Sequence, residues 1–444
     1  MEAFGQWLEL QYRHAAAAML RSISPLDIVK SRPGFGQTVR PLRGAIVASP
    51  VPASYDPEPD YFFHWYRDSS VVIDAVRALL EAGAMGAQAR AHFADFVSFA
   101  LALRKLDGRA LVQAPGWRTA VTEDFRQYVR SESELETIHG DAVAADTRVN
   151  PDGTLDISKW ARPQHDGPAL RALAVLNWLG TADLDCGVTA AASQLLRSDL
   201  EFTFRRARVP SYDIWEEERG LHYYTLCVSA AALARGAGWL ERSGQDEQAQ
   251  AQAQAYRAES MQIRHRLDGF WSEEQGFYRS RSLPGGERST KELDIAVVLA
   301  AIHAGGAAGA HTVADPRMHA TLARLESLFD AAYPINHNRP AHTSPAMGRY
   351  AGDVYYSGGA YFFSTLGAAE FCFRAAAVSA SREDWMARGD GYLATVRAYI
   401  PEGGGMSEQF DQRTGAPTSA RELAWSYAAF ISCIGARRAV IAGS

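Results

Sequence analysis

Apolar residues recur at three- and four-residue spacing along most of this chain, and this periodicity constrains the fold more than any other feature. Such spacing places the apolar side chains on one face of an α-helix. The pattern predicts helices over residues 3–22, 68–83, 86–105, 167–179, 188–206, 221–242, 246–266, 291–304, 316–329, 357–377, 383–398 and 419–441. Strand-like alternation is scarce. We therefore expect an all-α protein, with helices paired every ~30–40 residues in a closed ring of hairpins.

Two of these helices carry signals at their ends. Asp68 and Ser69 can cap the start of helix 68–83, and Gly83 can end it. Ser419 and Glu422 have the spacing of a capping box at the start of helix 419–441. No Pro/Ser-rich linker or change of composition divides the chain. We expect a single domain over 1–444.

The charge pattern argues against several partners. The net charge is −6, and the basic residues are scattered rather than grouped in a stripe, so neither a nucleic acid nor a membrane surface is expected as a partner. The N-terminal MEAFGQWLELQYRH lacks the basic and apolar regions of a signal peptide, which favours a cytoplasmic location. Four well-separated cysteines without a CxxC motif suggest reduced thiols in the core.

Several common chemistries lack their motifs. The sequence has no Walker A loop, no GxGxxG after a strand, no HExxH and no GxSxG, and its histidines form no ligand-spaced cluster. No metal or organic cofactor is expected.

Polar and aromatic residues instead gather in six non-helical segments, residues 49–67, 106–166, 207–219, 268–290, 333–356 and 399–418. Acidic, Arg, Trp and Tyr residues recur in PDYFFHWYRDSS (59–70), KWARPQHDGPALR (159–171), SYDIWEEERG (211–220), GRYAGDVYYSGG (348–359) and GGGMSEQFDQRTG (403–415). Loops on a rigid scaffold commonly carry the site. Sugar faces stack on aromatic rings, sugar hydroxyls bind Asp and Arg, and glycoside hydrolysis needs two carboxyl groups. Taken singly, such residues also serve packing and surface ion pairs. Together they favour a carbohydrate site.

The same segments resemble glycoside hydrolase family 15, the glucoamylases, in the family's order. YFFHWYRDSS resembles YFYxWxRDS, WARPQHDGPALRA resembles WGRPQxDGPALRA, and YDIWEE resembles YDLWEE. GRYAGDVYY resembles GRYPEDxYY, and MSEQFDQRTGAPTSARELAWSYAA resembles MSEQYDxxxGxxxSARDLTWSYAA. The resemblance implies an (α/α)6 barrel and an inverting exo-hydrolase that releases β-glucose from the non-reducing ends of α-glucans. On this basis we expect residues 1–444 to form one catalytic domain, with no starch-binding module and no N-terminal β-domain.

Carried over motif by motif, the resemblance implies that Glu216 is the general acid, Glu408 the general base, and Glu217 a ligand of the second sugar. Adjacent residues point about 100° apart on a helix or turn, so the two neighbouring glutamates cannot share one role. Trp215 as an apolar wall, together with negative neighbours, would raise the pKa of Glu216. An inverting pair of carboxyls should lie roughly 6.5–9.5 Å apart. Glu218 is expected to be a solvated acid that helps to raise its neighbours' pKa.

The remaining substrate-binding residues follow from the same motifs. Arg67 and Asp68 resemble the pair that binds the terminal sugar, although they could also be an ion pair that starts a helix. Tyr61 and Trp65 would line the same pocket, Trp160 and Arg162 the next subsites, and Arg349 the opposite side. Tyr355 and Trp215 could be pocket residues or simply core residues. Asp213 and Asp166 are expected to be turn residues or to support residues of the site.

Some positions depart from the family pattern: Ala351 and Gly352 in GRYAGD, His165, Tyr361 and Glu218. We expect these residues around the outer subsites, where linkage and chain length are selected. Short α-1,4-linked maltooligosaccharides are the expected substrates. Preference for α-1,6 linkages (isomaltose, glucodextran) or for trehalose is the alternative. A non-catalytic glucan sensor would have lost a catalytic carboxyl, and a protein-binding helical scaffold would not explain the loop motifs. The oligomeric state is not predicted.

Overall fold

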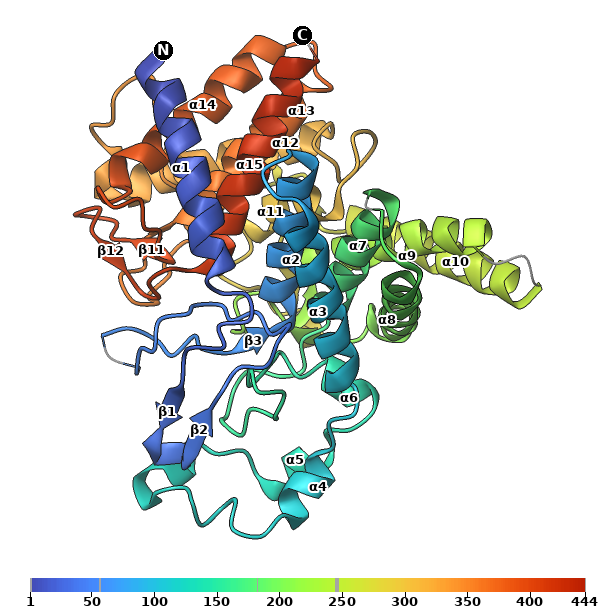
Figure 1. The fold of residues 1–444 in the computed structure, drawn as a ribbon. Coiled ribbons are helices and arrows are strands. Elements are labelled where there is room, and N and C mark those ends of the chain that lie inside the picture. The colour runs from blue at the N-terminus through green and yellow to red at the C-terminus, as the bar shows by residue number, and fades with distance from the viewer. Residues whose placement is uncertain (1, 56, 182, 244–246, 444) are drawn as a thin grey trace.

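A computed structural model describes residues 2–55, 57–181, 183–243 and 247–443 (Figure 1). Within these ranges twelve helices have nine or more residues, and each corresponds to a predicted one. Residue 246, where one predicted helix begins, lies outside the described residues. The helices are α1 (Glu2–Leu20), α2 (Tyr66–Glu81), α3 (Ala87–Leu103), α7 (Asp166–Thr181), α8 (Cys186–Arg206), α9 (Tyr223–Ser243), α10 (Glu247–Asp268), α11 (Ala296–Ala304), α12 (Pro316–Ala332), α13 (Phe362–Ala376), α14 (Arg382–Tyr399) and α15 (Ala424–Ala442).

Six of these helices close an inner ring. Each of α2, α7, α9, α11, α13 and α15 packs on the next, and α15 packs back on α2. The helices α3, α8, α10, α12, α14 and α1 pack on them from outside, in the same order. The predicted all-α (α/α)6 barrel is therefore confirmed.

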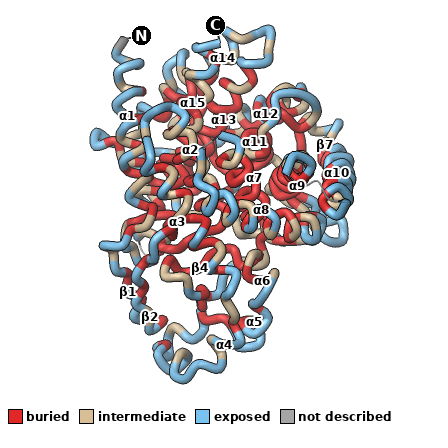
Figure 2. The backbone as a smooth tube through the Cα atoms, turned by 45° about the vertical axis from the view of Figure 1, so that its right-hand side comes forward, coloured by how far each residue is buried: buried red, intermediate tan, exposed pale blue. Residues whose placement is uncertain are grey.

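Burial decides which helices are inner. Helix α13 buries every residue except Arg374, whereas α14 buries a single stripe. Figure 2 shows the same contrast between the largely buried α11 and α13 and the exposed outer face of α10. A helix that is apolar all round can satisfy its side chains only inside the ring.

The six loops that precede the inner helices gather at one end of the barrel, because each outer helix returns the chain to that end. They are residues 21–65, 104–165, 207–222, 269–295, 333–361 and 400–423, and they contain nearly all of the predicted non-helical segments. The segment predicted to be non-helical between 106 and 166 contains three short helices, α4 (Gly108–Gln113), α5 (Glu132–Glu136) and α6 (Asp141–Ala144), and a 3-10 turn, η2 (Glu123–Tyr128). The other 3-10 turns are η1 (Pro33–Phe35), η3 (Pro284–Gly286) and η4 (Pro334–Asn336).

Short antiparallel strands tie these loops to one another. The pairs are β1 (Lys30–Arg32) with β2 (Gln37–Val39), β3 (His64–Trp65) with β4 (Arg148–Val149), and β7 (Trp271–Ser272) with β8 (Phe277–Tyr278). Three-stranded groups join β5 (Ser211–Tyr212), β6 (Arg219–His222) and β9 (Arg281–Ser282), and β10 (Ala360–Tyr361), β11 (Gln409–Phe410) and β12 (Pro417–Thr418). Trp65 pairs with Arg148, and Tyr361 with Gln409, so segments far apart in sequence are held together.

The helix ends differ in part from their predicted signals. Gly83 follows α2 with φ 68°, and its N–H donates to the Leu80 carbonyl, as predicted for a helix end. Asp68 and Ser69 lie in the first turn of α2 rather than capping it. The predicted capping box is wrong, since α15 begins at Ala424 and Leu423 precedes it without a side-chain cap. Ser419 instead contacts Glu408.

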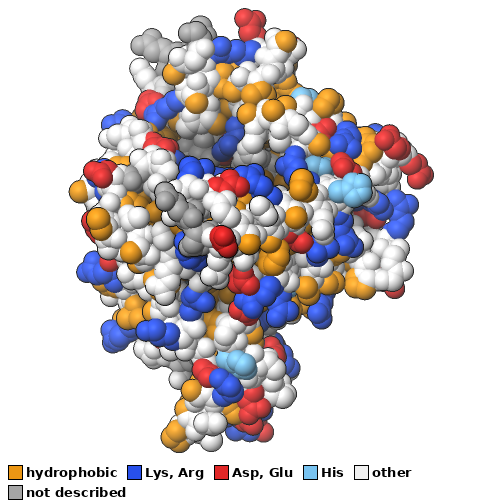
Figure 3. Space-filling model, turned by 90° about the vertical axis from the view of Figure 1, so that its right-hand side faces the viewer, with side chains coloured by type: hydrophobic (Ala, Val, Ile, Leu, Met, Phe, Trp, Pro, Cys, Tyr) orange, Lys and Arg blue, Asp and Glu red, His pale blue; other side chains and the backbone are white. Residues whose placement is uncertain are grey.

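The surface mixes basic and acidic side chains on the face shown in Figure 3. Nowhere in the described part of the chain is there a helix that is both long and apolar enough to cross a membrane. The four cysteines are free, and Cys227, Cys372 and Cys433 are buried as expected. Cys186 is exposed at the start of α8, so the prediction of a core thiol is wrong there.

Candidate active site

A cavity of about 270 Å³ lies among the loops that precede the inner helices. Eleven of the twelve predicted site residues line it: Tyr61, Trp65, Arg67, Asp68, Trp160, Trp215, Glu216, Glu217, Arg349, Tyr355 and Glu408. Ala48, Ile214, Phe363, Leu423 and Trp425 complete the lining. The structure thus brings together residues that lie up to about 350 positions apart in sequence, because ring closure places their loops at one end.

Glu216 lies in the hairpin between β5 and β6, with a left-handed backbone at φ 65°. A non-glycine residue in this conformation is held by its surroundings, and such residues cluster at functional sites. Asp213 supplies part of the restraint, because its Oδ1 accepts the backbone N–H groups of Glu217 (2.8 Å) and Glu218 (2.9 Å). Asp213 therefore has the turn role predicted for it.

Three N–H donors hold the carboxyl group of Glu216. Trp65 Nε1 donates to its Oε1 at 2.8 Å, Arg67 Nη2 donates to the same oxygen at 3.1 Å, and Trp160 Nε1 donates to Oε2. The prediction that Trp215 forms an apolar wall beside Glu216 is wrong. Trp215 turns its indole N–H to Asp294 and its ring toward Phe363, while Trp65 and Trp160 stand beside the glutamate. The nearest ionic partner of Glu216 is the cation Arg67.

Glu408 approaches the cavity from the loop before β11. Tyr61 Oη donates to its two oxygens at 3.3 and 3.4 Å, and Ser419 Oγ donates to Oε2. Burial raises the pKa of Glu408 to about 7, against the lowering effects of the Ser419 hydrogen bond and the charge of Arg349. A buried carboxyl that titrates near neutrality can exchange a proton under physiological conditions. Tyr61 also bonds Tyr355 Oη at 2.8 Å, so Glu408 is connected to a chain of two tyrosine hydroxyls.

Arg67 lies between Glu216 and two further carboxyls, which are Asp68 at 3.4 Å and Asp166 at 3.5 Å. Burial raises the pKa of Asp68 to about 6, although Arg67 opposes this effect. The Oδ2 atom of Asp68 is buried and has no hydrogen-bond partner among the described residues. Because a buried polar atom without a partner is costly, Asp68 offers a ready acceptor to a ligand hydroxyl in the cavity. Asp166 supports Arg67 and lies outside the lining.

The opposite wall is built on Glu217. Its Oε1 binds Arg349 Nη2 at 3.0 Å, its Oε2 binds Lys291 Nζ at 2.6 Å, and Tyr350 Oη also donates to Oε2. Asp353 holds Arg349 by two bonds of 2.6 Å. The sequence reasoning missed Lys291, Tyr350, Asp353 and Ser419 as parts of the site. Tyr350, Asp353 and Ser419 occur within the quoted motifs, which could have pointed to them, whereas nothing in the pattern marks Lys291.

Glu218 turns away from the cavity. It binds Arg281 Nη1 at 2.7 Å and Ser289 Oγ at 2.8 Å. Burial acts to raise the pKa of Glu218, but these hydrogen bonds outweigh it and the pKa is lowered. The prediction of a solvated acid is therefore wrong, because Glu218 anchors the hairpin of Glu216 to the loop before α11.

Three more predicted positions lie away from the cavity. Arg162 is paired with Asp146 and Asp156 and braces its own loop. His165 is buried against Phe202, and Tyr361 is buried, where its hydroxyl accepts from Gln409 Nε2 at 2.8 Å. His165 and Tyr361 therefore do not flank outer subsites, contrary to the prediction.

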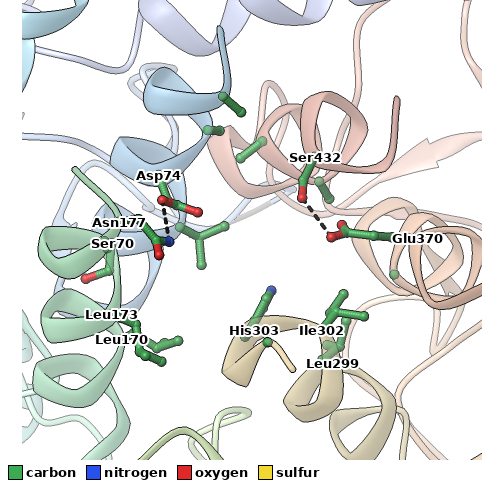
Figure 4. A pocket seen from close by; sticks show the side chains of 18 of the residues that line it. Ser70, Asp74, Leu170, Leu173, Asn177, Leu299, Ile302, His303, Glu370 and Ser432 are labelled. Atoms are coloured by element: carbon green, nitrogen blue, oxygen red, sulfur yellow. Dashed lines mark hydrogen bonds between the residues drawn. The ribbon is translucent and has the colours of Figure 1, made fainter. Parts of the chain in front are cut away.

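A second cavity, of about 330 Å³, shares the stacked rings of Phe363 and Trp425 with the first. Figure 4 shows two polar pairs facing each other across it, Asp74 with Asn177 and Glu370 with Ser432. Asp74 is also paired with Arg77 at 2.7 Å, and Glu370 with Arg374 at 2.6 Å. Both of these carboxylates are bound by an arginine of their own helix, and none of the predicted site residues lines this cavity, although it is the larger of the two.

A helical barrel in which two carboxyls, the partly buried Glu216 and the buried Glu408, line one aromatic cavity is consistent with a glycoside hydrolase. The model of the glycosyl hydrolases family 15 matches residues 32–101, 146–389 and 384–435, and the chain belongs to this family. The predicted family is thereby confirmed.

Curated relatives agree with this assignment. Glucoamylase 1 of Rhizopus oryzae is 25% identical over 96% of this chain and 70% of its own length. A probable glucoamylase of Schizosaccharomyces pombe is 26% identical over 98% of this chain and 92% of its own. Among solved structures, the family 15 glucoamylase from Hypocrea jecorina superposes with a TM-score of 0.79 at 23% identity, covering 98% of this chain and 73% of its own. The glucoamylase from Saccharomycopsis fibuligera gives 0.78 at 19% identity, covering 99% and 96%. These two structures support the barrel fold.

Proposed function

We propose that this protein is an exo-acting α-glucoside hydrolase of glucoamylase type, which releases glucose from the non-reducing ends of short α-glucans. The observation that carries the proposal is the single cavity into which Glu216 and Glu408 project from loops nearly 200 residues apart. Membership of family 15 and the glucoamylase relatives support the same activity. The stacked rings of Phe363 and Trp425 add to the aromatic lining of the cavity.

The reaction we propose inverts the anomeric centre. Glu216 protonates the glycosidic oxygen as the bond to the terminal sugar breaks, and Glu408 takes a proton from the water that attacks the opposite face. Two O–H donors, Tyr61 and Ser419, favour the ionised form that a base needs. They oppose the stronger effect of burial, which raises the pKa of Glu408 to about 7. The first product is then β-glucose. Glu408 leaves the cycle protonated and Glu216 ionised, and exchange with water restores both.

Substrate binding follows from the two walls of the cavity. We assign the terminal sugar to Arg67 and Asp68, with Arg349 on the other side. Asp68 Oδ2 is buried and lies 3.4 Å from Arg67 Nη2, but it accepts no hydrogen bond from the described residues. Glu217 would bind the second sugar, and the rings of Trp65 and Trp160 would stack on sugar faces. The non-catalytic alternative, a glucan sensor, is disfavoured because both Glu216 and Glu408 are present and line the cavity.

A linkage panel with resolved anomers tests this proposal. We expect kcat/KM to be highest on maltose and longer α-1,4 glucans, with isomaltose and trehalose as the competing substrates. Proton NMR of the fresh product should show the β-anomer first. Glu216→Gln and Glu408→Gln should both lower turnover by at least about 100-fold. Glu370→Gln, which changes a buried glutamate of the second cavity, should retain it. Formation of α-glucose would reject inversion, and full activity of both site variants would reject the mechanism.

A further inference from the structure

A shallow depression on the surface lies next to the cavity. Tyr55, Val354 and Tyr356 line this depression together with Glu217 and Tyr355. Glu217 and Tyr355 also line the active-site cavity, so the two hollows are adjacent. A chain whose end occupies the cavity would therefore leave it past these residues.

Two tyrosines in the depression share an uncommon conformation. Tyr55 has φ 47° and Tyr356 has φ 54°, and their exposed fractions are 52% and 38%. A bulky residue in the left-handed region is a steric outlier that costs about 1–3 kcal/mol. Burial offsets this cost only in part, because both side chains remain substantially exposed. Such strain at a surface aromatic residue suggests that the position of its ring matters.

The two residues are also fixed relative to the site. Tyr356 Oη donates to the Tyr55 carbonyl at 3.3 Å, and the Tyr356 ring meets the Tyr355 ring edge-on at 4.8 Å. Tyr355 Oη in turn bonds Tyr61 Oη, which contacts Glu408. The aromatic surface is thus connected by direct contacts to the position of the proposed base.

We infer that Tyr55 and Tyr356 form an outer platform for the glucosyl units beyond the two nearest the cleavage point. This inference rests on the proposed function, in which Glu217 binds the second sugar. The third and fourth sugars would then lie over the depression, where an aromatic ring stacks on the apolar face of a pyranose. The platform favours maltotriose and longer chains over maltose and acts on chain-length preference rather than on the chemical step.

The test compares chain lengths in matched variants. Tyr55→Asn and Tyr356→Asn remove the ring but keep a residue that tolerates the left-handed conformation, so the backbone is not strained further. Tyr356→Phe keeps the ring and serves as the control. We expect the ratio of kcat/KM on maltotetraose to that on maltose to fall about three- to tenfold in each Asn variant. The Phe variant should retain the wild-type ratio.

Each other outcome has a defined meaning. An unchanged ratio in both Asn variants overturns the platform but leaves the proposed function intact, provided that the wild type hydrolyses maltose. A fall in Tyr356→Phe as large as in Tyr356→Asn overturns stacking, because the hydroxyl would then be responsible. An unchanged ratio with an altered oligomeric state in gel filtration would assign the surface to a second copy of the chain. A wild type that hydrolyses none of these glucans refutes the proposed function and the platform with it.

Discussion

Replacing Glu408 by Gln should inactivate the protein and yet stabilise it at alkaline pH. Burial raises the pKa of this carboxyl from its ordinary value of 4.5 to about 7. At 1.36 kcal/mol for each tenfold change, the raised pKa corresponds to about 3 kcal/mol. Below pH 4.5 the group is protonated in both the folded and the unfolded chain, so it carries no ionisation penalty. As the pH rises through 7, the folded wild type must ionise a buried carboxyl and loses that stability.

The amide should fit the site without leaving a polar atom unpaired. Ser419 Oγ, which donates to Oε2 of Glu408, can donate to the amide oxygen of Gln instead. The amide nitrogen can donate to Tyr61 Oη, which remains able to donate to Tyr355 Oη at 2.8 Å. The exchange therefore removes the charge while keeping the volume and the hydrogen bonds.

Thermal unfolding at two pH values measures the effect. With an unfolding entropy of about 2.1 cal/mol/K per residue over 444 residues, a gain of 3 kcal/mol raises Tm by about 3 °C. We expect this rise at pH 8 and none at pH 4.5. Glu370→Gln is the matched control, because Glu370 is also buried but is paired with Arg374 at 2.6 Å. Removing the charge of Glu370 should therefore lower Tm at pH 8. Equal Tm differences at both pH values, or none at pH 8, would refute the reasoning.

Three further predictions concern the site. Glu216→Gln should lower kcat by about 10²–10⁴-fold on maltose. The loss should be smaller on an aryl α-glucoside with an acidic phenol, which needs less protonation on leaving, and equal losses would argue against general-acid catalysis. The value of kcat/KM should decrease as the pH drops below about 7, because Glu408 must be ionised to act as base. The hydrogen bond from Ser419 lowers the pKa of Glu408, so Ser419→Ala should raise this pKa and move the acidic limb to higher pH. If the limb does not move, a group other than Glu408 is responsible for it. Glu218→Gln should cost about 1 kcal/mol at pH 8 by weakening the contact with Arg281, whose other carboxylate partners remain. Because the pKa of Glu218 is lowered in the folded protein, this cost should vanish in acid, where the carboxyl is protonated. Chemical denaturation of both proteins at pH 8 and in acid measures it. A cost that is the same under both conditions would show that the ion pair is not its cause.

The order of the long helices could be predicted from short stretches of the sequence. The twelve long helices follow from spacing within windows of about 15–20 residues, and the quoted motifs marked eleven of the residues that line the cavity. Helix ends were less predictable, because Ser419 and Glu422 match a cap by spacing but find partners in other loops. The resemblance identified positions, but it could not say what each side chain touches.

The sequence by itself determined the helical barrel, the family and the identity of the two candidate catalytic glutamates. The tertiary structure decided which side chains surround them. It placed Trp65 and Trp160 rather than Trp215 beside Glu216, paired Glu218 with Arg281, and brought Lys291 to Glu217. It also buried Glu408 deeply enough to raise its pKa to about 7. The physical reason is that periodicity reports which face of a helix is buried, whereas ion pairs and desolvation depend on loops that meet only when the ring of helices closes.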